Sequence, residues 1–525
     1  MVQDGDAYAA GMSELSPAQR EALGALLNAA PFAKVVRDLG RRFAERGHEL
    51  YLVGGTVRDA LLDRTAPDAD IDLTTDATPD QILAVVRAGN WGGGVWLQGV
   101  RYGTVGVRKG DFKLDITTFR SDSYREDSRK PEVTFGHSIE EDLARRDFTV
   151  NAMAMKLPDG PFVDPHGGLA DLAAKRLRTP SSPEISFEDD PLRMLRAARF
   201  AAQLELTPTP ETLAAISERR ERLQIVSRER IRDELSRLLL GRAPAKGLWL
   251  IVNAGLAEEF LPELPALALE QDPVHRHKDV LRHTIAVVER ATAFDADEPD
   301  LTLRMAALLH DIGKPRTRRV GPEGVTFHLH EVVGAKMAEQ RLTELRYPSD
   351  FIADVRQLVL LHLRFHTYRL GWSDSAVRRY VRDAGPLLDR LNFLVRSDCT
   401  TRNVFKARQL AAYSDELEAR MDAALGYPTV DPHGDPIPTA ELEIEERRTE
   451  ALSDLEPRAR ATFVRISDSD PEMLRYLADR GIAPGDCFEV LDKQPFDGPI
   501  FARFGDQVHV LGGALAKAMR VELVR

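Results

Sequence analysis

The chain has 525 residues, which is enough for about three to four domains of roughly 150 residues each. Hydrophobic residues make up 43% and charged residues 29%, which excludes disordered and fibrous classes. Two cysteines, Cys399 and Cys487, exclude a disulfide framework and a cysteine-rich zinc site, so any metal site must use Asp, Glu and His. The net charge of -12 argues against a uniformly basic nucleic-acid coat, but it leaves room for local RNA-binding faces. Without a membrane-length apolar run or a signal-like start, we expect a cytoplasmic protein that does not enter membranes.

Hydrophobic periodicity divides the chain into parts of different character. Apolar positions at helical spacing over 17–47 predict helices that pack on the next unit. Short β-rich runs separated by Gly, Asp and Pro then predict a small α+β domain, called the head, and long helical runs follow it. We expect N-terminal helices over 1–48, the head over 49–180, a helical neck and body over 181–270, a second helical domain over 271–425, a linker over 426–460 and a β-rich module over 461–525.

A pair of glycines stands at the end of the first strand expected in the head. Gly54 and Gly55 follow LYLV and precede TVRDALLD, so their backbone amides can approach phosphate oxygens at the start of a helix. Arg58 lies one turn further on and is expected to face the same place. A glycine pair is more often a plain turn, so this motif depends on its neighbours.

Acidic residues follow on the next two β-like runs. Asp70 and Asp72 lie two apart in ADIDLTT, and alternation along a strand puts both carboxylates on one face. Asp115 in KLDITTF is expected to add a carboxylate from a neighbouring strand. An oxygen-rich site of this kind suits Mg²⁺ that also holds substrate phosphates. A lone Asp-x-Asp is usually a polar loop, but the glycine pair upstream favours the metal site.

Five motifs in this order resemble those of class II tRNA nucleotidyltransferases and their poly(A) polymerase relatives. They are LVGGTVRDALLDRTAPDADIDLTTDATPDQI, the ribose-checking RRDFTVNAMAM, the flexible DPHGGLADLAAKRLRT, the nucleotide-selecting DDPLRMLRAARFA and the neck-body RERIRDEL. The resemblance implies a multidomain α+β fold, with a small polymerase-β-like nucleotidyltransferase head followed by an all-helical neck and body that binds RNA and nucleotide.

The resemblance also implies roles for individual residues. The catalytic carboxylates would be Asp70, Asp72 and Asp115, with Asp70 and Asp72 holding Mg²⁺ that activates an RNA 3′-hydroxyl and neutralises the incoming triphosphate. Arg145, Arg146 and Asp147 would contact the ribose and phosphates. The full nucleotide-binding set would be Gly54, Gly55, Arg58, Arg145, Arg146, Asp147, Asp190, Arg193 and Arg196.

Base choice follows from the donors and acceptors at the nucleotide-selecting motif. Asp190 would accept from the exocyclic amine of C or A, and Arg193 would donate to the ring atom beside it. G and U present a carbonyl where the amine should be, so the pair would reject them. The family motif usually reads Glu-Asp-x-x-Arg, whereas the first position here is Asp189. Without the resemblance, Asp-x-x-Arg would indicate a helix N-cap acid with an i,i+3 ion pair.

The catalytic motifs do not separate CCA addition to tRNA from poly(A) addition. In the polymerase relatives a basic Gly-Arg-Arg-Phe segment follows the first motif, but the corresponding VWLQGVRYGTVGV lacks it, and GRRF at 40–43 lies upstream in a helical pattern. We therefore favour a CCA-adding enzyme that uses CTP, ATP and tRNA and binds no DNA. Poly(A) polymerase remains the alternative, and the oligomeric state stays open.

Histidines and aspartates in the second helical domain resemble the metal centre of HD phosphohydrolases. His283, His310 with Asp311, and Asp398 follow the family order, while His330 and His362 add candidate ligands for a second ion of unknown identity. A lone histidine on an apolar helix is usually a core residue, but the ordered set favours a divalent metal. Relatives with this domain can hydrolyse phosphates or 2′,3′-cyclic phosphates at tRNA ends, so a metal-dependent phosphohydrolase is a further alternative.

The C-terminal segment resembles a different family. FVRISDSDPEMLRYLADRGIAPGDCFEVL and VLGGALAKAMRVEL are similar to the SH3-like C-terminal module of diphtheria-toxin-repressor-type metalloregulators. The winged helix and main metal ligands of those regulators have no counterpart in this chain, which disfavours a repressor. The module could pack against the body, aid self-association or replace part of a tRNA-binding tail.

Overall fold

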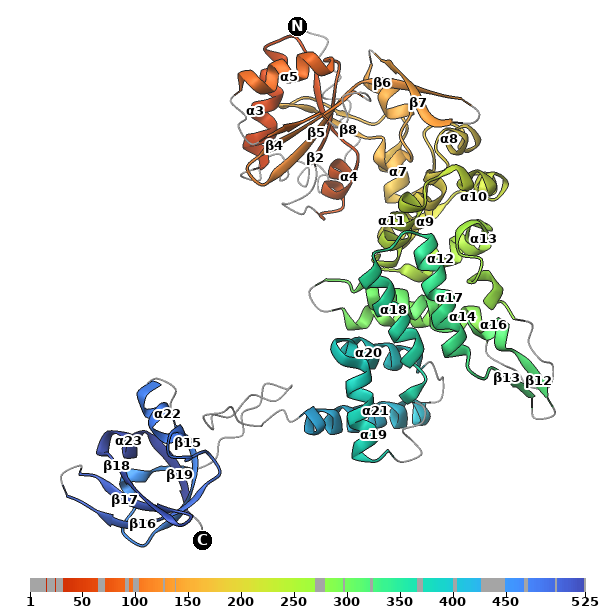
Figure 1. The fold of residues 1–525 in the computed structure, drawn as a ribbon. Helices are drawn as coiled ribbons and strands as arrows, with labels where there is room; N and C mark the ends of the chain where they lie inside the picture. The colour runs from red at the N-terminus through yellow and green to blue at the C-terminus, as the bar shows by residue number, and fades with distance from the viewer. Residues whose placement is uncertain are drawn as a thin grey trace. The chain divides into compact units, whose positions relative to one another are not determined.

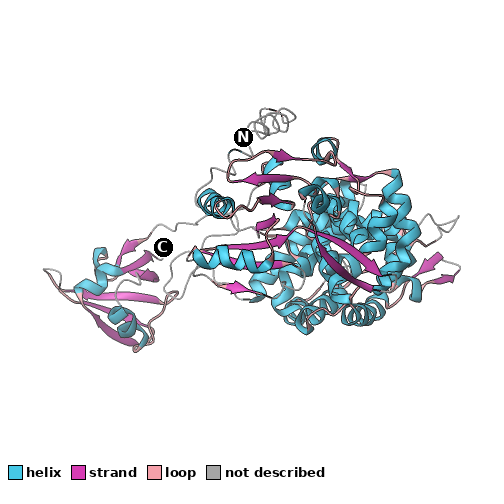
Figure 2. Cartoon of the chain, turned by 90° about the horizontal axis from the view of Figure 1, so that it is seen from above, coloured by secondary structure: helices cyan, strands magenta, loops and turns pink. Residues whose placement is uncertain are grey.

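The computed structural model describes residues 16, 24, 32–64, 71–89, 94–97, 103–125, 128–136, 138–269, 279–295, 298–321, 324–365, 372–399, 404–425, 449–466, 471–495 and 498–523 (Figure 1). The chain forms two compact units, residues 1–372 with 380–415 and residues 373–379 with 416–525. Among the described residues, each helix is too short or too polar to span a membrane. Helices dominate the larger unit (Figure 2), and most of its strands come before residue 178.

A seven-stranded sheet of order β3-β4-β5-β2-β1-β8-β9 forms the head. Its β2 and β5 run parallel, while the other recorded pairs are antiparallel. Beside it lies the hairpin of β6 and β7. The elements are α3 (Phe32–Ala44), β1 (Leu50–Val53), α4 (Gly55–Leu61), β2 (Ile71–Thr75), α5 (Pro79–Ala88), β3 (Val95–Trp96), β4 (Thr104–Lys109), β5 (Phe112–Thr118), β6 (Arg120–Arg125), β7 (Ser128–Phe135), α6 (Ile139–Ala144), β8 (Ala154–Leu157) and β9 (Phe162–Val163).

The two faces of the head sheet differ in burial. On β5 the residues alternate, with Phe112, Leu114 and Ile116 buried and the residues between them more exposed. Helix α3 packs on the buried face, where a Cβ at Gly40 would lie 2.8 Å from the Cβ of Leu157. This period-two pattern leaves the polar residues of the central strands on the opposite face.

Helices of the neck and body follow the head. Helix α9 packs against α11 and α12, and glycines permit the close approach, since a Cβ at Gly247 would lie 2.6 Å from the carbonyl oxygen of Ala198. The elements are α7 (Gly168–Ala173), β10 (Arg176–Leu177), α8 (Pro183–Asp189), α9 (Leu192–Leu204), β11 (Thr207–Pro208), α10 (Pro210–Arg219), α11 (Arg228–Leu239), α12 (Pro244–Asn253) and α13 (Leu256–Phe260).

The second helical domain is built around contacts of α15 with α14, α18 and α20 and of α17 with α18. Buried Arg304 on α15 ties it to the neck, because its guanidinium donates to the carbonyls of Leu239 and Gly241. The elements are α14 (Val280–Ala291), α15 (Leu301–Leu309), α16 (Lys314–Thr317), β12 (Arg319–Gly321), β13 (Gly324–Thr326), α17 (His330–Glu344), α18 (Ser349–Leu361), α19 (Asp374–Ala384), α20 (Leu388–Asp398) and α21 (Val404–Leu425).

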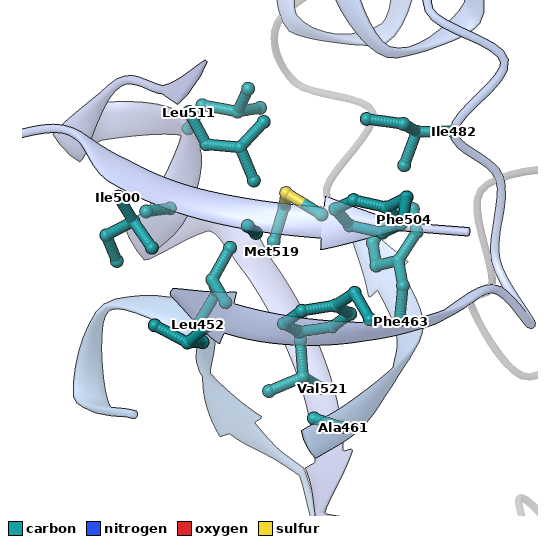
Figure 3. Packing of buried hydrophobic residues seen from close by; sticks show 14 of the residues in the cluster. Leu452, Ala461, Phe463, Ile482, Ile500, Phe504, Leu511, Met519 and Val521 are labelled. Carbon is teal, nitrogen blue, oxygen red and sulfur yellow. The ribbon is translucent and has the colours of Figure 1, made fainter. Parts of the chain in front are cut away.

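A six-stranded sheet of order β14-β19-β15-β16-β17-β18 forms the C-terminal module. Its core includes Phe463, Phe504, Met519 and Val521 (Figure 3). The elements are β14 (Glu450–Ala451), β15 (Arg460–Ile466), α22 (Pro471–Ala478), β16 (Cys487–Lys493), β17 (Ile500–Phe504), β18 (Gln507–Leu511), α23 (Gly513–Ala518) and β19 (Met519–Leu523). The sheet thus begins at Glu450, inside the stretch expected as a linker over 426–460, because a two-residue strand is too short to show alternation.

Candidate functional site

The carboxylates of the head meet in one cross-strand row. Asp72 on β2 and Asp115 on β5 are register partners of the parallel pair, so their side chains leave the same face of the sheet. Asp72 is exposed and Asp115 half-buried, while the hydrophobic residues on either side of each are buried. Asp70 lies outside the described residues, so its expected place beside Asp72 remains a prediction. The described pair gives a hard divalent cation two oxygen ligands on adjacent strands.

The glycine motif reaches the same place. Gly54 follows β1 and caps the start of α4 with a φ of 72°, a conformation that favours glycine. A Cβ there would lie 3.0 Å from Nη1 of Arg146 and 3.8 Å from Oδ2 of Asp72. The absent side chain therefore leaves room where an arginine and a candidate metal-binding carboxylate converge. Arg145 and Arg146 follow α6, so residues about 90 positions apart in the chain meet there.

Both arginines are held by one acid that the motif comparison did not single out. Asp142 is fully buried on α6, and its two oxygens accept from Arg145 at 2.7 Å and from Arg146 at 3.2 Å. Burial opposes ionisation of Asp142, but the charges of Arg145 and Arg146 outweigh it and hold the pKa of the carboxyl below its ordinary value. Asp142 thus fixes where the two guanidinium groups stand.

Asp147 connects the head with the neck. Its Oδ1 accepts from the Asn151 amide at 3.0 Å, and its Oδ2 accepts from Nε of Arg196 at 2.7 Å. Although burial raises the pKa of Asp147, the Arg196 charge and these hydrogen bonds lower it well below the ordinary range. The buried Asp147 is therefore a positioning group between η2 (Thr149–Asn151) and α9.

Arg58, expected to face phosphate, lies beside the glycine pair, since its Nη2 is 3.6 Å from a Cβ placed at Gly55, and it also has partners within the protein. Its guanidinium donates to both oxygens of Asp59, at 2.9 and 2.8 Å, and to Oδ1 of Asn151 at 2.6 Å. It also lies 5.3 Å from the centre of the Phe200 ring on α9. These partners make Arg58 a link between α4, η2 and the neck. Spacing along the chain predicted the helical turn that carries Arg58, but it could not predict which groups would accept hydrogen bonds from its guanidinium.

The proposed base-reading residues lie at the start of α9. Asp190 accepts from the backbone N–H of Leu192 at 3.2 Å and pairs with Arg230 of α11 at 3.1 Å. Arg193 is buried and donates to the Ser186 hydroxyl at 2.8 Å and to the carbonyl of Arg145. The N-cap of α9 is Pro191, so Asp190 accepts from the backbone just ahead of the N-cap position, and its recorded ion partner comes from RERIRDEL. That contact joins two motifs separated by about 40 residues.

A cationic cluster surrounds the Phe200 ring. The guanidinium carbons of Arg196 and Arg199 lie 5.7 and 4.5 Å from its centre, in addition to that of Arg58. Buried Glu234 of α11 balances them, with Oε2 lying 3.2 Å from Nε of Arg199. Burial and the neighbouring Arg196 lower the pKa of Arg199 to about 10. The periodicity of α9 predicted a helix here but not this aromatic centre.

A second cluster lies in the helical domain and contains all six residues expected there. His283 comes from α14, His310 and Asp311 follow α15, His330 begins α17, His362 follows α18 and Asp398 ends α20. Nε2 of His283 is 2.9 Å from Asp398, and Nε2 of His310 and His330 each lie 3.3 Å from an Asp311 oxygen. Two possible ligand groups share Asp311, namely His283 with His310 and His330 with His362.

The histidine tautomers make this cluster suitable for a cation. Nδ1 of His310, His330 and His362 lies 2.8, 2.8 and 2.6 Å from the carbonyl oxygen three residues upstream. A proton on each Nδ1 leaves the Nε2 lone pair pointing inward, and these three Nε2 atoms are buried without a hydrogen-bond partner. Lone pairs facing carboxylate oxygens repel each other unless a positive charge lies between them. The donor set therefore fits divalent metal.

The charges of the cluster act strongly on one another. Burial opposes ionisation of Asp311, but the neighbouring His310 outweighs it and lowers the pKa of the carboxyl well below its ordinary value. Burial lowers the pKa of His362 to about 3, and a proton on Nε2 of His310, which a bound metal would displace, adds to this effect. Lys314, which the motif comparison did not single out, donates to Oδ2 of Asp311 at 2.6 Å. The sequence signal for this contact was the position of Lys314 three residues after Asp311 in HDIGK, a spacing that brings side chains together on a helical turn.

Four family models match successive parts of the chain. Residues 50–178 match the poly A polymerase head domain, and residues 205–267 match the probable RNA and SrmB-binding site of polymerase A. Residues 280–403 match the HD domain and residues 451–523 the FeoA domain. The head, RNA-binding and HD resemblances are thereby confirmed at the level of domains. The FeoA match supports a separate β-rich module, and the finer repressor resemblance stays a prediction.

Curated relatives match less than half of the chain. The CCA-adding enzyme of Levilactobacillus brevis is 41% identical over 224 residues, which cover 42% of this chain and 54% of the relative. The CCA-adding enzyme of Bacillus subtilis is 43% identical over 221 residues, which cover 42% and 53%. The chain thus spans about half the length of the curated relatives it matches.

Solved structures extend the likeness over more of the fold. The Bacillus stearothermophilus CCA-adding enzyme in complex with CTP aligns with a TM-score of 0.51 and 25% identity, covering 75% of this chain and 83% of that one. A tRNA nucleotidyltransferase complexed with a primer tRNA and an incoming ATP analog has a TM-score of 0.51 and 22% identity, which shows a shared fold.

Proposed function

We propose that this protein is a metal-dependent nucleotidyltransferase that adds C, C and A to the 3′ end of tRNA from CTP and ATP. The observation that carries the proposal is the convergence of Asp72, Asp115, Gly54 and Arg146 on one face of the head sheet. The relatives named as CCA-adding enzymes and the likeness to one in complex with CTP support it.

Different residues of the head would bind the metal and the phosphates in this reaction. Asp72 and Asp115, with Asp70, would hold Mg²⁺, which would activate the RNA 3′-hydroxyl and neutralise charge on the triphosphate. The phosphates lie against the backbone at Gly54 and Gly55 and against Arg146, which Asp142 orients. Because the attacking and leaving oxygens must stand in line, fixed positions of these groups contribute much of the rate.

Base selection belongs to the start of α9. Asp190 accepts from the amine of C or A, and Arg193 donates to the neighbouring ring atom. Ser186 and the Arg145 carbonyl hold the Arg193 guanidinium before any nucleotide arrives, so the side chain loses little conformational freedom on binding. Arg145, Arg196 and Asp147 connect this reader with the phosphate site.

The domain roles follow the expected boundaries. The head over 49–180 carries the chemistry, the neck and body over 181–270 bind nucleotide and RNA, and 271–425 form the HD domain. Under this proposal residues 1–48 would pack on the head, 426–460 would lead into the C-terminal module and 461–525 would form most of it. That module is SH3-like, as in diphtheria-toxin-repressor-type regulators, a proposal that the FeoA match supports.

Labelled CTP and ATP, supplied separately and together with Mg²⁺, test the proposal on tRNA transcripts. One transcript ends before CCA, a second ends after CC, and an unrelated RNA serves as the control. We expect addition that stops after C, C and A and occurs on tRNA alone. Long A tails on any RNA would instead establish poly(A) polymerase, and incorporation of a single nucleotide type would establish partial CCA addition.

The inward-facing Nε2 atoms of His310, His330 and His362 favour a second activity. With divalent metal, the HD domain would cleave phosphoesters such as a 2′,3′-cyclic phosphate at a tRNA end. Opening of the cyclic phosphate by water to a phosphomonoester that stays on the ribose, measured with Mg²⁺, Mn²⁺, Co²⁺ and Ni²⁺ in turn, tests this. Metal binding without turnover would limit the cluster to a structural role.

A further inference from the structure

The carboxylate row of the head continues across two further strands. Trp96 on β3 is the register partner of Gly106 on β4, and Gly106 is the register partner of Asp115. With Asp72, four residues on four neighbouring strands therefore lie in one line across the sheet. Register partners point to the same face, so Trp96 and Gly106 belong to the face that carries the carboxylates.

Gly106 lets the indole of Trp96 lie over its strand. A Cβ at Gly106 would be 1.8 Å from Cε2 and 1.9 Å from Nε1 of Trp96, so the indole occupies the space of the missing side chain. Strands are about 4.8 Å apart, which places the indole about one strand spacing from Asp115. Gly106 is buried beneath the ring, whereas Trp96 itself is only half-buried.

The order of groups along this row indicates which substrate the indole meets. Gly54 and Arg146, proposed for the triphosphate, approach Asp72 from the β1 side, and Trp96 approaches Asp115 from the β4 side. In an in-line transfer at a metal site, the attacking and leaving oxygens lie on opposite sides of the transferred phosphorus. The RNA end that carries the attacking 3′-hydroxyl therefore belongs on the side of Trp96.

We infer that Trp96 is a stacking platform for the terminal base of the RNA primer, held over Gly106 beside Asp115. This inference rests on the proposed nucleotide addition. Stacking on an aromatic ring tolerates any base, which suits a site where the primer end changes as C, C and A are added. Lys113 adds a positive charge 5.8 Å from the indole, on the side where a backbone phosphate must follow.

The experiment compares two primers and three proteins. One primer is a tRNA transcript that lacks CCA, and the other is identical except that its last nucleotide has no base but keeps the 3′-hydroxyl. Equilibrium affinity and the KM and kcat of CTP addition are measured for the wild type, Trp96→Ala and Trp96→Phe. Trp372→Ala is the matched control, since Trp372 is half-buried against Tyr380 on α19, outside the head.

Stacking predicts a specific coupling between the protein and the primer. Removing the terminal base should weaken wild-type binding about ten- to a hundredfold and leave Trp96→Ala almost unaffected, because that variant has already lost the contact. Trp96→Phe and Trp372→Ala should keep the wild-type sensitivity. If Trp96→Ala does not fold, Gly106→Ala provides the same comparison, because its methyl group must displace the indole.

The outcomes separate this inference from the proposed function. Equal sensitivity to base removal in wild type and Trp96→Ala would overturn the stacking role while CTP addition by the wild type still stands. A uniform loss of affinity for both primers in Trp96→Ala would show a packing role and overturn it as well. Wild-type protein that binds the primer with base-dependent affinity but adds no nucleotide would support the platform and refute nucleotide addition. Wild-type protein that neither binds nor extends either primer would overturn both.

Discussion

Asp72 and Asp115 are register partners on the parallel strands β2 and β5, although 43 positions separate them in the chain. β2 and β5 are hydrogen-bonded directly to each other, so the two carboxylates cannot move apart without breaking the centre of the sheet. A rigid pair of oxygen ligands loses little conformational freedom when it binds a small hard cation. The head thus uses its most constrained element for its proposed chemistry.

Replacing either carboxylate should stop nucleotide addition. We expect Asp72→Asn and Asp115→Asn each to lower kcat for CTP incorporation by about a thousandfold, because each removes a ligand and a negative charge at the metal. The melting temperature should stay near the wild-type value, since Asp72 is exposed and Asp115 half-buried. Asp111→Asn, in the exposed turn before β5, is the matched control. Near-normal incorporation by either site variant would contradict the assignment.

Asp142 should govern nucleotide affinity although it is fully buried. In Asp142→Asn the two guanidinium groups of Arg145 and Arg146 lose a charged partner, so we expect the KM for CTP and ATP to rise about tenfold. Steady-state kinetics with each nucleotide measures this. Glu141→Gln, one residue away and exposed, should leave KM unchanged. The positioning role fails if both variants behave alike.

Asp147 should make stability depend on pH in the acid range. Its folded pKa lies below that of the unfolded chain, so its contribution is complete above about pH 4 and is lost as the pH falls toward the folded pKa. Asp147→Asn should therefore cost about 3 kcal/mol of unfolding free energy at pH 7 and less at pH 3. Urea unfolding at both pH values measures the difference.

The control for this experiment is Asp159→Asn. Asp159 also pairs with an arginine, Arg37 at 3.1 Å, but it is 67% exposed. An exposed pair contributes little, so this variant should match the wild type at both pH values. A cost for Asp147→Asn that stays constant from pH 7 to pH 3 would mean that its ionisation does not contribute.

Divalent metal should bind the HD cluster through His310 and His362. His310→Ala and His362→Ala should each weaken metal binding at least about a hundredfold, because each removes a ligand whose lone pair already points inward. Calorimetric titration of chelator-treated protein with Mn²⁺ or Co²⁺ measures this. His328→Ala, an exposed neighbour of the cluster, is the control. Unchanged affinity in His362→Ala would remove it from the ligand set.

Gly313 should control the position of His330. A Cβ at Gly313 would lie 2.1 Å from the carbonyl oxygen of His330 and 2.7 Å from the Gly334 nitrogen, so Gly313→Ala must push α17 away from the cluster. We expect weaker metal binding and a loss of about 1–3 kcal/mol of stability. Gly321→Ala is the control, because the nearest atom to its Cβ is 3.9 Å away. Equal metal affinity in both variants would show that α17 tolerates the shift.

Much of the candidate site was predictable because it consists of short local patterns. A glycine pair after an apolar strand, alternating acids in a β run and histidines at helix ends each follow from the neighbouring residues. The ordered motifs then indicated a head, a helical neck and an HD domain, which the family matches confirm. The strand adjacency expected for Asp115 is also present in the register of β2 and β5.

Other features were invisible because they depend on contacts between distant segments. Asp142 looks like one acid among several in IEEDLA, and only the packed head buries it against Arg145 and Arg146. Arg58 was placed correctly on its turn, but the tertiary contact with Asn151 determines where its guanidinium points. Periodicity specifies which face of an element is buried, but not which element covers it.

The sequence by itself indicated the order of the domains and the types of candidate site residue, since local spacing and the resemblance to known families both lie in short stretches of chain. The tertiary structure alone decided the partnerships: Asp190 with Arg230, Phe200 with its arginines, and Trp96 over Gly106 beside Asp115. Each of these joins segments that the chain separates, and only the register of strands and the packing of helices determine their distance.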